Sequence, residues 1–200
     1  MIGIDEEGAL AQLKALRKTL FDPKVTVHHG RIVKNTGDGA LVESGSVVDA
    51  VRCAVEIQRC IAEQNIDVPK VKQIELRIGI HVRDIIVDEN DIFGDGVNIA
   101  VRLEGIAEPG GVCISDDAYR QVRGKVEIAC DDMGPQPLKN IAEPMRAWRV
   151  RLAGQTRGTI TFGCEPASGA PASRQAVHRL ASVHQHERRS GTGLLCWWNG

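Results

Sequence analysis

The stretch Arg31-Ile-Val-Lys-Asn-Thr-Gly-Asp-Gly-Ala-Leu-Val42 predicts two strands joined by a tight turn at residues 37–39. The glycines on both sides of Asp38 permit positive φ angles and let an ion or a phosphate approach the backbone. A divalent cation such as Mg²⁺ prefers carboxylate oxygens, so Asp38 is a candidate metal ligand. Considered alone, this motif is better explained as an ordinary Gly-Asp-Gly turn.

Around this hairpin, the chain alternates between helical and strand patterns up to residue 152. The predicted elements are a helix over 5–20, a helix from Ser46 to about Ala62, a strand over 74–82 with a short return strand over 84–87, a helix over 97–107, a helix capped by Ser115, and three short strands ending with 146–152. This order predicts an α+β fold in which helices cover one face of a mixed, largely antiparallel sheet. No strand precedes the first predicted helix, although a split βαβ arrangement would begin with one.

A second group of polar residues lies in Asp91-Ile-Phe-Gly-Asp-Gly-Val-Asn98-Ile-Ala-Val-Arg102. Asn98 and Arg102 are four residues apart in a predicted helix, so both project from one face. An amide and a guanidinium in this arrangement can reach one ligand, and arginine commonly stabilises charge on a transferring phosphoryl group. A surface pair without a ligand is the commoner explanation for any single Asn/Arg pair.

The composition favours a single globular domain at residues 1–152, followed by a tail of different character. The chain is 42% apolar with a net charge of −1, which does not indicate a nucleic-acid or acidic-membrane partner. No apolar run is long enough to span a membrane, so a cytoplasmic location is expected. Residues 153–200 contain neither lysine nor aspartate, and their lack of periodicity predicts a disordered tail.

Taken together, the motifs resemble the class III adenylate/guanylate cyclase catalytic domain of bacteria. The resemblance covers residues 1–152 and rests on the stretches quoted above together with Glu-Leu-Arg-Ile-Gly-Ile-His at 75–81, Ala-Glu-Pro-Gly-Gly-Val-Cys-Ile-Ser at 107–115 and Leu-Lys-Asn-Ile at 138–141. It implies a ferredoxin-like cyclase fold. It also implies intracellular signalling by conversion of ATP to 3′,5′-cyclic AMP and pyrophosphate at a homodimer interface, with Mg²⁺ or Mn²⁺ as cofactor.

The resemblance implies a role for each candidate site residue. Asp38 would bind the metal ions, and Lys34 and Asp91 would bind the adenine ring, which indicates ATP rather than GTP. Asn98 would orient the ribose, and Arg102 would stabilise the charge that develops on the α-phosphate. The glycine-rich hairpin of cyclic-di-GMP synthases is absent, which argues against that related class of enzyme.

The chain departs from the family pattern at both ends. The family's first metal-binding aspartate lies on an opening strand, which here would lie upstream of residue 1. We therefore expect impaired activity, an incomplete N-terminus and an exposed strand edge, with a catalytically inactive regulatory or dimerisation module, or a gene fragment, as the alternative. A second hypothesis is that a frameshift between Leu152 and Arg174 produced the tail, because codons allowed for 174–200 can encode a family-like segment in another frame.

Overall fold

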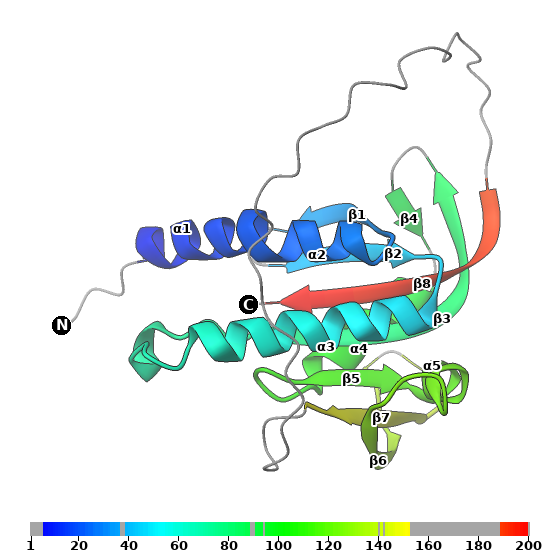
Figure 1. Cartoon of the computed structure of the whole chain (residues 1–200). Helices are drawn as coiled ribbons and strands as arrows, with labels where there is room; N and C mark the ends of the chain where they lie inside the picture. Colours follow the sequence, from blue (N-terminus) through cyan, green and yellow to red (C-terminus); the bar gives the residue numbers. More distant parts are fainter. Residues whose placement is uncertain are drawn as a thin grey trace, which may run out of the picture.

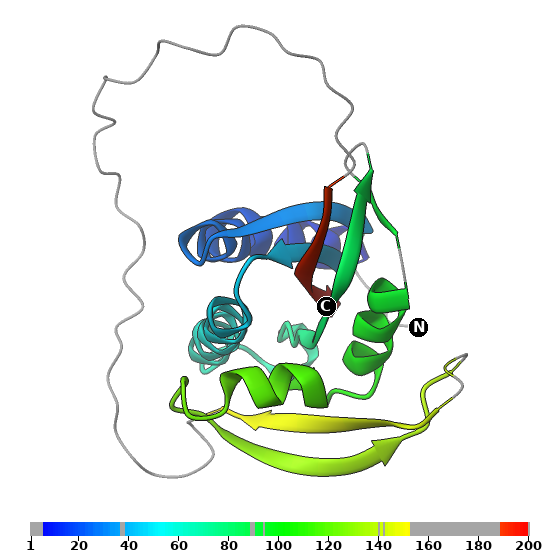
Figure 2. The same ribbon diagram turned by 90° about the vertical axis from the view of Figure 1, so that its right-hand side faces the viewer.

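The computed structural model describes residues 6–36, 39–88, 91–93, 95–139, 141, 143–152 and 189–199. These residues form one eight-stranded sheet, in the order β1-β2-β8-β3-β5-β7-β6 with β4 paired to β3, and helices lie on both faces (Figures 1 and 2). The helices are α1 (Glu6–Leu16), α2 (Asp22–Val27), α3 (Val47–Gln64), α4 (Asp95–Gly105) and α5 (Asp116–Val122), with a π-helical turn η1 (Arg17–Phe21) and a 3-10 turn η2 (Lys70–Lys72). The strands are β1 (Gly30–Thr36), β2 (Gly39–Ser44), β3 (Arg77–Asp88), β4 (Asp91–Phe93), β5 (Val112–Ser115), β6 (Ala129–Gln136), β7 (Met145–Arg151) and β8 (Arg189–Asn199).

The helices α1, α2 and α3 cover one face of the sheet and enclose the main core. The helix predicted over 5–20 buries one apolar stripe, at Leu13, Leu16 and Leu20. The helical path continues through η1 and α2 to Val27, seven residues beyond the predicted end. Ser46 caps α3 as predicted, because its Oγ accepts a hydrogen bond from the backbone N–H of Asp49.

The sheet is mixed, since β3 and β5 run parallel while the other pairs are antiparallel. The α+β class and the hairpin at 31–42 are therefore confirmed. The predicted return strand over 84–87 is wrong, because β3 continues without a break to Asp88 and the returning strand is β4. In the described part of the body after α5, the structure has two strands, β6 and β7, rather than the three predicted.

The most important difference from prediction concerns the centre of the sheet. Among the described residues no strand precedes α1, yet the position between β2 and β3 is filled by β8 from the C-terminal region. This strand runs antiparallel to both neighbours, pairing Leu194–Asn199 with β2 and Arg189–Asn199 with β3 (Figure 1). The expected exposed edge is thus covered, and the expected disorder does not hold for 189–199, whereas 153–188 lies outside the described residues.

The sequence of β8 suits a central position. The neighbouring strands are buried on both faces, with Ala40, Leu41 and Val42 on β2 and 78–82 on β3. A strand between them needs apolar residues at successive positions rather than in alternation. Residues 194–198, Leu-Leu-Cys-Trp-Trp, meet this requirement.

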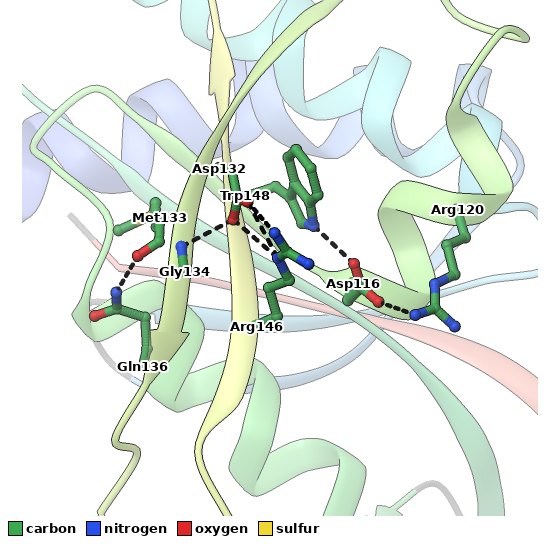
Figure 3. A network of polar contacts seen from close by, with 8 residues as sticks. All are labelled: Asp116, Arg120, Asp132, Met133, Gly134, Gln136, Arg146 and Trp148. Carbon is green, nitrogen blue, oxygen red and sulfur yellow. Dashed lines mark hydrogen bonds and ion pairs between the residues drawn. The ribbon is translucent and has the colours of Figure 1, made fainter.

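A network of aromatic and charged side chains fastens α5 to the outer strands β6 and β7 (Figure 3). The ring of Trp148 stacks on Tyr119 with 3.7 Å between centroids, and its Nε1 donates a 2.9 Å hydrogen bond to Asp116. Arg146 lies 5.5 Å from the centroid of the Trp148 ring and forms an ion pair with Asp132. This network lies at the far edge of the sheet from the hairpin, so we assign it a structural role.

A buried histidine connects β3 with the start of α5. Nδ1 of His81 shares a 3.0 Å hydrogen bond with Oγ of Ser115, which also accepts from the backbone N–H of Ala118 and so caps α5 as predicted. Burial lowers the pKa of His81 to about 4, with smaller and opposite influences from Asp117 and Arg83. His81 is therefore neutral in the folded protein at neutral pH.

None of the helices among the described residues combines the length and apolar character required to cross a bilayer.

The pairing of β8 can be tested with Leu195→Pro, because proline removes an N–H from the middle of a three-strand ladder. We expect amide hydrogen exchange, measured by mass spectrometry, to accelerate at least about tenfold in 40–42 and 78–82. Ser182→Pro, outside the strand, is the control and should leave both segments protected. Unchanged protection in the Leu195→Pro protein would show that β8 does not hold this position.

His81 predicts a specific pH dependence of stability. The unfolded chain binds a proton at this residue below its ordinary pKa of about 6.5, whereas the folded protein does so only near pH 4. The stability present above pH 6.5 is therefore lost as the pH falls toward 4, by about 3 kcal/mol in total. Urea denaturation across this range should give a smaller pH slope for His81→Asn, while His29→Asn, at a side chain that is 86% exposed, should keep the original slope.

Candidate active site

The hairpin residues predicted for the site lie at the end of β1 and in the following turn. Lys34 is exposed and pairs with Leu41, immediately after a register shift between Ile32 and Lys34 that marks a β-bulge at Val33. Bulges commonly occur beside functional sites, where they redirect a side chain. Asp38 lies outside the described residues, so its role remains a prediction.

The strand β4 brings the predicted base-binding residues into one region. Asp91 begins β4 and its backbone pairs with Asp88, although its side chain lies outside the described part of the molecule. Strands β1 and β4 contact each other despite being far apart in sheet order. The two strands that carry Lys34 and Asp91 therefore lie together.

Helix α4 carries Asn98 and Arg102 on the opposite face of the sheet from α3 (Figure 2). Its inward face is fixed by Ile99, Ala100 and Leu103, which are all buried. Asn98 is exposed and Arg102 is half-buried. The Nε of Arg102 is buried and bonds to none of the described residues, so this guanidinium retains an unused donor.

The close packing of α4 against β3 depends on Gly79. This glycine lies within the 75–81 motif, and no role was predicted for it from the sequence. A Cβ at this position would lie 2.2 Å from the carbonyl oxygen of Ala100 and 2.4 Å from the backbone nitrogen of Glu104. Only glycine allows the helix backbone to approach the strand this closely. A glycine inside an alternating strand is the signal that could have identified it.

The predicted residues form two groups within one chain. Lys34 and Asp91 lie on contacting strands, whereas Asn98 and Arg102 lie on α4, whose main packing partners are β3, β8, β5 and β4. The two groups are joined through the sheet by β8, which lies between the hairpin and β3 and also packs against α4. Helix α4 also contacts β4, the strand that carries Asp91, so the two groups adjoin each other.

The described residues contain no cluster of three or more His, Cys, Asp or Glu side chains suited to holding a metal ion. Asp38, the predicted metal ligand, is not among them. The expected Mg²⁺ or Mn²⁺ site therefore remains a prediction, and no chemical step is derived from it.

Gly79→Ala tests the close packing of the α4 backbone against β3. The added methyl group must displace the helix backbone, so we expect a loss of about 3 kcal/mol in the free energy of unfolding. Gly45→Ala is a matched control, because a Cβ there meets no described atom within 4 Å. Urea denaturation should show near-wild-type stability for Gly45→Ala, and equal stability of the two variants would contradict the proposed contact.

Comparison with known proteins places this architecture in a family. The family model described as "Adenylate and Guanylate cyclase catalytic domain" matches residues 6–151. A relative named "Putative adenylate cyclase 3", from Rhizobium meliloti, is 42% identical over 168 residues, covering 84% of this chain and 29% of that protein. The chain therefore spans less than a third of that relative.

Solved structures agree with the sequence comparison. An "Adenylate/Guanylate Cyclase/Hydrolase" from Silicibacter pomeroyi is 41% identical with a TM-score of 0.71, and the match covers 74% of this chain and 86% of that one. The adenylyl cyclase CyaB of P. aeruginosa, at 22% identity, has a TM-score of 0.61 with 78% and 88% covered, which shows a shared fold. The chain belongs to the adenylate and guanylate cyclase catalytic domain family.

Proposed function

We propose that this chain is an adenylate cyclase catalytic domain that converts ATP to 3′,5′-cyclic AMP and pyrophosphate at a homodimer interface. The observation that carries the proposal is α4, which directs exposed Asn98 and half-buried Arg102 away from a buried face. The Nε of Arg102 bonds to none of the described residues, and a guanidinium carries further N–H donors that suit an anionic ligand. Membership of the cyclase family makes a nucleoside triphosphate the natural candidate.

The proposed reaction requires stabilisation of charge on the phosphate rather than a covalent enzyme intermediate. The ribose 3′-oxygen attacks the α-phosphorus, the bond from that phosphorus to the bridging oxygen breaks, and pyrophosphate leaves. The proton of the 3′-hydroxyl passes to water. Arg102 would stabilise the charge on the α-phosphoryl oxygens, and Asn98 would orient the ribose.

The homodimer is proposed because the candidate groups belong to different parts of one chain. Asp38 belongs to the hairpin turn, whereas Asn98 and Arg102 belong to α4. A two-fold pair of chains would let the metal-binding Asp38 of one protomer face Lys34, Asp91, Asn98 and Arg102 of its partner. We propose Mg²⁺ or Mn²⁺, held through Asp38, to bind the triphosphate.

ATP is proposed over GTP on the basis of Lys34 and Asp91. A carboxylate accepts a hydrogen bond from the amino group of adenine, whereas guanine presents a carbonyl oxygen at the equivalent ring position. The contact between β1 and β4 supports joint action of Lys34 and Asp91 on one base.

We also propose that the cyclase activity of this chain is impaired. The central position of the sheet, where the family resemblance implies a strand with the first metal-binding aspartate, is taken by β8. Residues 189–199 include no aspartate or glutamate. Two closely spaced divalent ions held by Asp38 alone would be poorly neutralised.

An assay of the full chain with ATP and Mn²⁺, with cyclic AMP quantified by mass spectrometry, tests both proposals. We expect turnover below about 0.1 s⁻¹, compared with a median of about 10 s⁻¹ for enzymes in general. Arg102→Ala should reduce the remaining activity at least about 100-fold. Arg52→Ala, an exposed arginine on α3, is the control and should retain activity.

The outcomes separate the alternatives. Turnover near the enzyme median would contradict impairment, and GTP used in preference to ATP would contradict the base assignment. Absence of cyclic nucleotide together with a dimer in analytical ultracentrifugation would instead support an inactive dimerisation or regulatory module. The occupation of the central position by β8 is the observation that favours this second candidate.

A further inference from the structure

A side chain from the first helical path contacts the hairpin close to Lys34. Arg17, the first residue of η1, donates a 2.5 Å hydrogen bond from Nη2 to Oδ1 of Asn35 on β1. Asn35 directly follows Lys34 and pairs with Ala40. The bond therefore joins a helix to the part of the hairpin that carries the proposed base-binding lysine.

The strand needs a restraint at this point because of the bulge. The register shift between Ile32 and Lys34 leaves Val33 as an extra residue, and both Lys34 and Asn35 are exposed. A change of one residue in pairing would turn Lys34 to the other face of the hairpin. A contact after the bulge fixes which face Lys34 occupies.

Arg17 is suited to this restraint because its side chain is largely buried and its backbone is anchored in the core. The side chain is 17% exposed, and its Nε forms a 3.9 Å ion pair with the Oδ1 of Asp22 without a hydrogen bond. The π turn that begins at Arg17 carries Leu20 and Phe21 into the core, which anchors the backbone of this segment. π turns inside helices occur frequently at functional sites.

Another arginine in the hairpin provides a comparison. Arg31 forms a 2.6 Å ion pair with Glu43 across the β1–β2 pair. This contact lies before the bulge and links two strands that are already paired. It therefore contributes to the hairpin without setting the register beyond Val33.

We infer that Arg17 is a positioning residue for nucleotide binding, because its bond to Asn35 fixes the orientation of Lys34 after the bulge. The inference deepens the proposed function and rests on it for the identity of the ligand. Arg17 acts through Asn35 and does not itself contact the nucleotide.

The first experiment measures the hairpin without any ligand. Amide hydrogen exchange of the full chain, followed by NMR, compares Arg17→Met with Arg31→Met, a matched loss of an arginine head group. We expect exchange at 34–36 to accelerate about tenfold in Arg17→Met and to stay within about twofold in Arg31→Met. Equal exchange at 34–36 in wild type and Arg17→Met would overturn the inference.

The second experiment measures the affinity for N-methylanthraniloyl-ATP with Mn²⁺ by fluorescence anisotropy. We expect the dissociation constant to rise about fivefold in Arg17→Met and in Asn35→Leu, with no further rise in the double variant. Asn35→Asp keeps an acceptor for Arg17 and should bind like wild type. Arg31→Met should also bind like wild type, and a fivefold loss in that variant would overturn the inference.

The two experiments separate this inference from the proposed function. A wild-type chain that does not bind the nucleotide contradicts the proposed function, while the exchange measurement still decides whether Arg17 positions the hairpin. Additive losses of affinity in the double variant would overturn the inference. A loss of thermal stability large enough to account for the whole change in affinity would also overturn it, because Arg17 would then have a structural role alone.

Discussion

The main-chain hydrogen bonds from β8 to both β2 and β3 hold the sheet together. This strand joins the β1–β2 hairpin to the larger part of the sheet. Without it, two buried strands would each present an edge of unpaired N–H and C=O groups, which is costly away from water. The same ladder determines the relative position of the hairpin, which carries Lys34, and of α4, which carries Asn98 and Arg102. A strand from the far end of the sequence thus assembles both the core and the candidate site.

Much of the fold could be predicted from the sequence because local signals were strong. Ser46 and Ser115 mark helix starts through side-chain capping, a contact within three residues, and both caps are present. The Gly-rich turn at 37–39 identifies the hairpin for the same local reason. The position of β8 could not be predicted, because strand pairing over more than 100 residues leaves no local pattern. The run Leu-Leu-Cys-Trp-Trp was a usable signal for a buried strand, but the polar composition of 153–200 outweighed it.

The candidate residues could be selected from the sequence, but the contacts that support them could not. Lys34, Asp91, Asn98 and Arg102 were selected from motifs and from the family resemblance that those motifs carry, and their roles remain predictions. Their supports are contacts between segments distant in sequence, such as the backbone approach of α4 to Gly79. The hydrogen bond from Arg17 to the hairpin is another contact of this kind. A single sequence does not reveal such pairs, because each member has an ordinary local role as a strand glycine or a helix arginine.

Departures from regular structure lie close to the candidate site. They include a π turn at Arg17, a bulge at Val33 and a buried Nε of Arg102 that bonds to none of the described residues. The π turn has poorer hydrogen-bond geometry, and the bulge interrupts the pairing of the strands. Desolvation of the unpaired donor costs about 1–3 kcal/mol. Such costs persist where the surrounding fold over-determines the geometry, and they concentrate at functional sites. The irregularities are physical features of the backbone and side chains, whereas the motifs are features of sequence. The π turn and the bulge lie beside Lys34, and Arg102 lies on α4. The irregularities therefore adjoin both groups of candidate residues, and this observation does not depend on family resemblance.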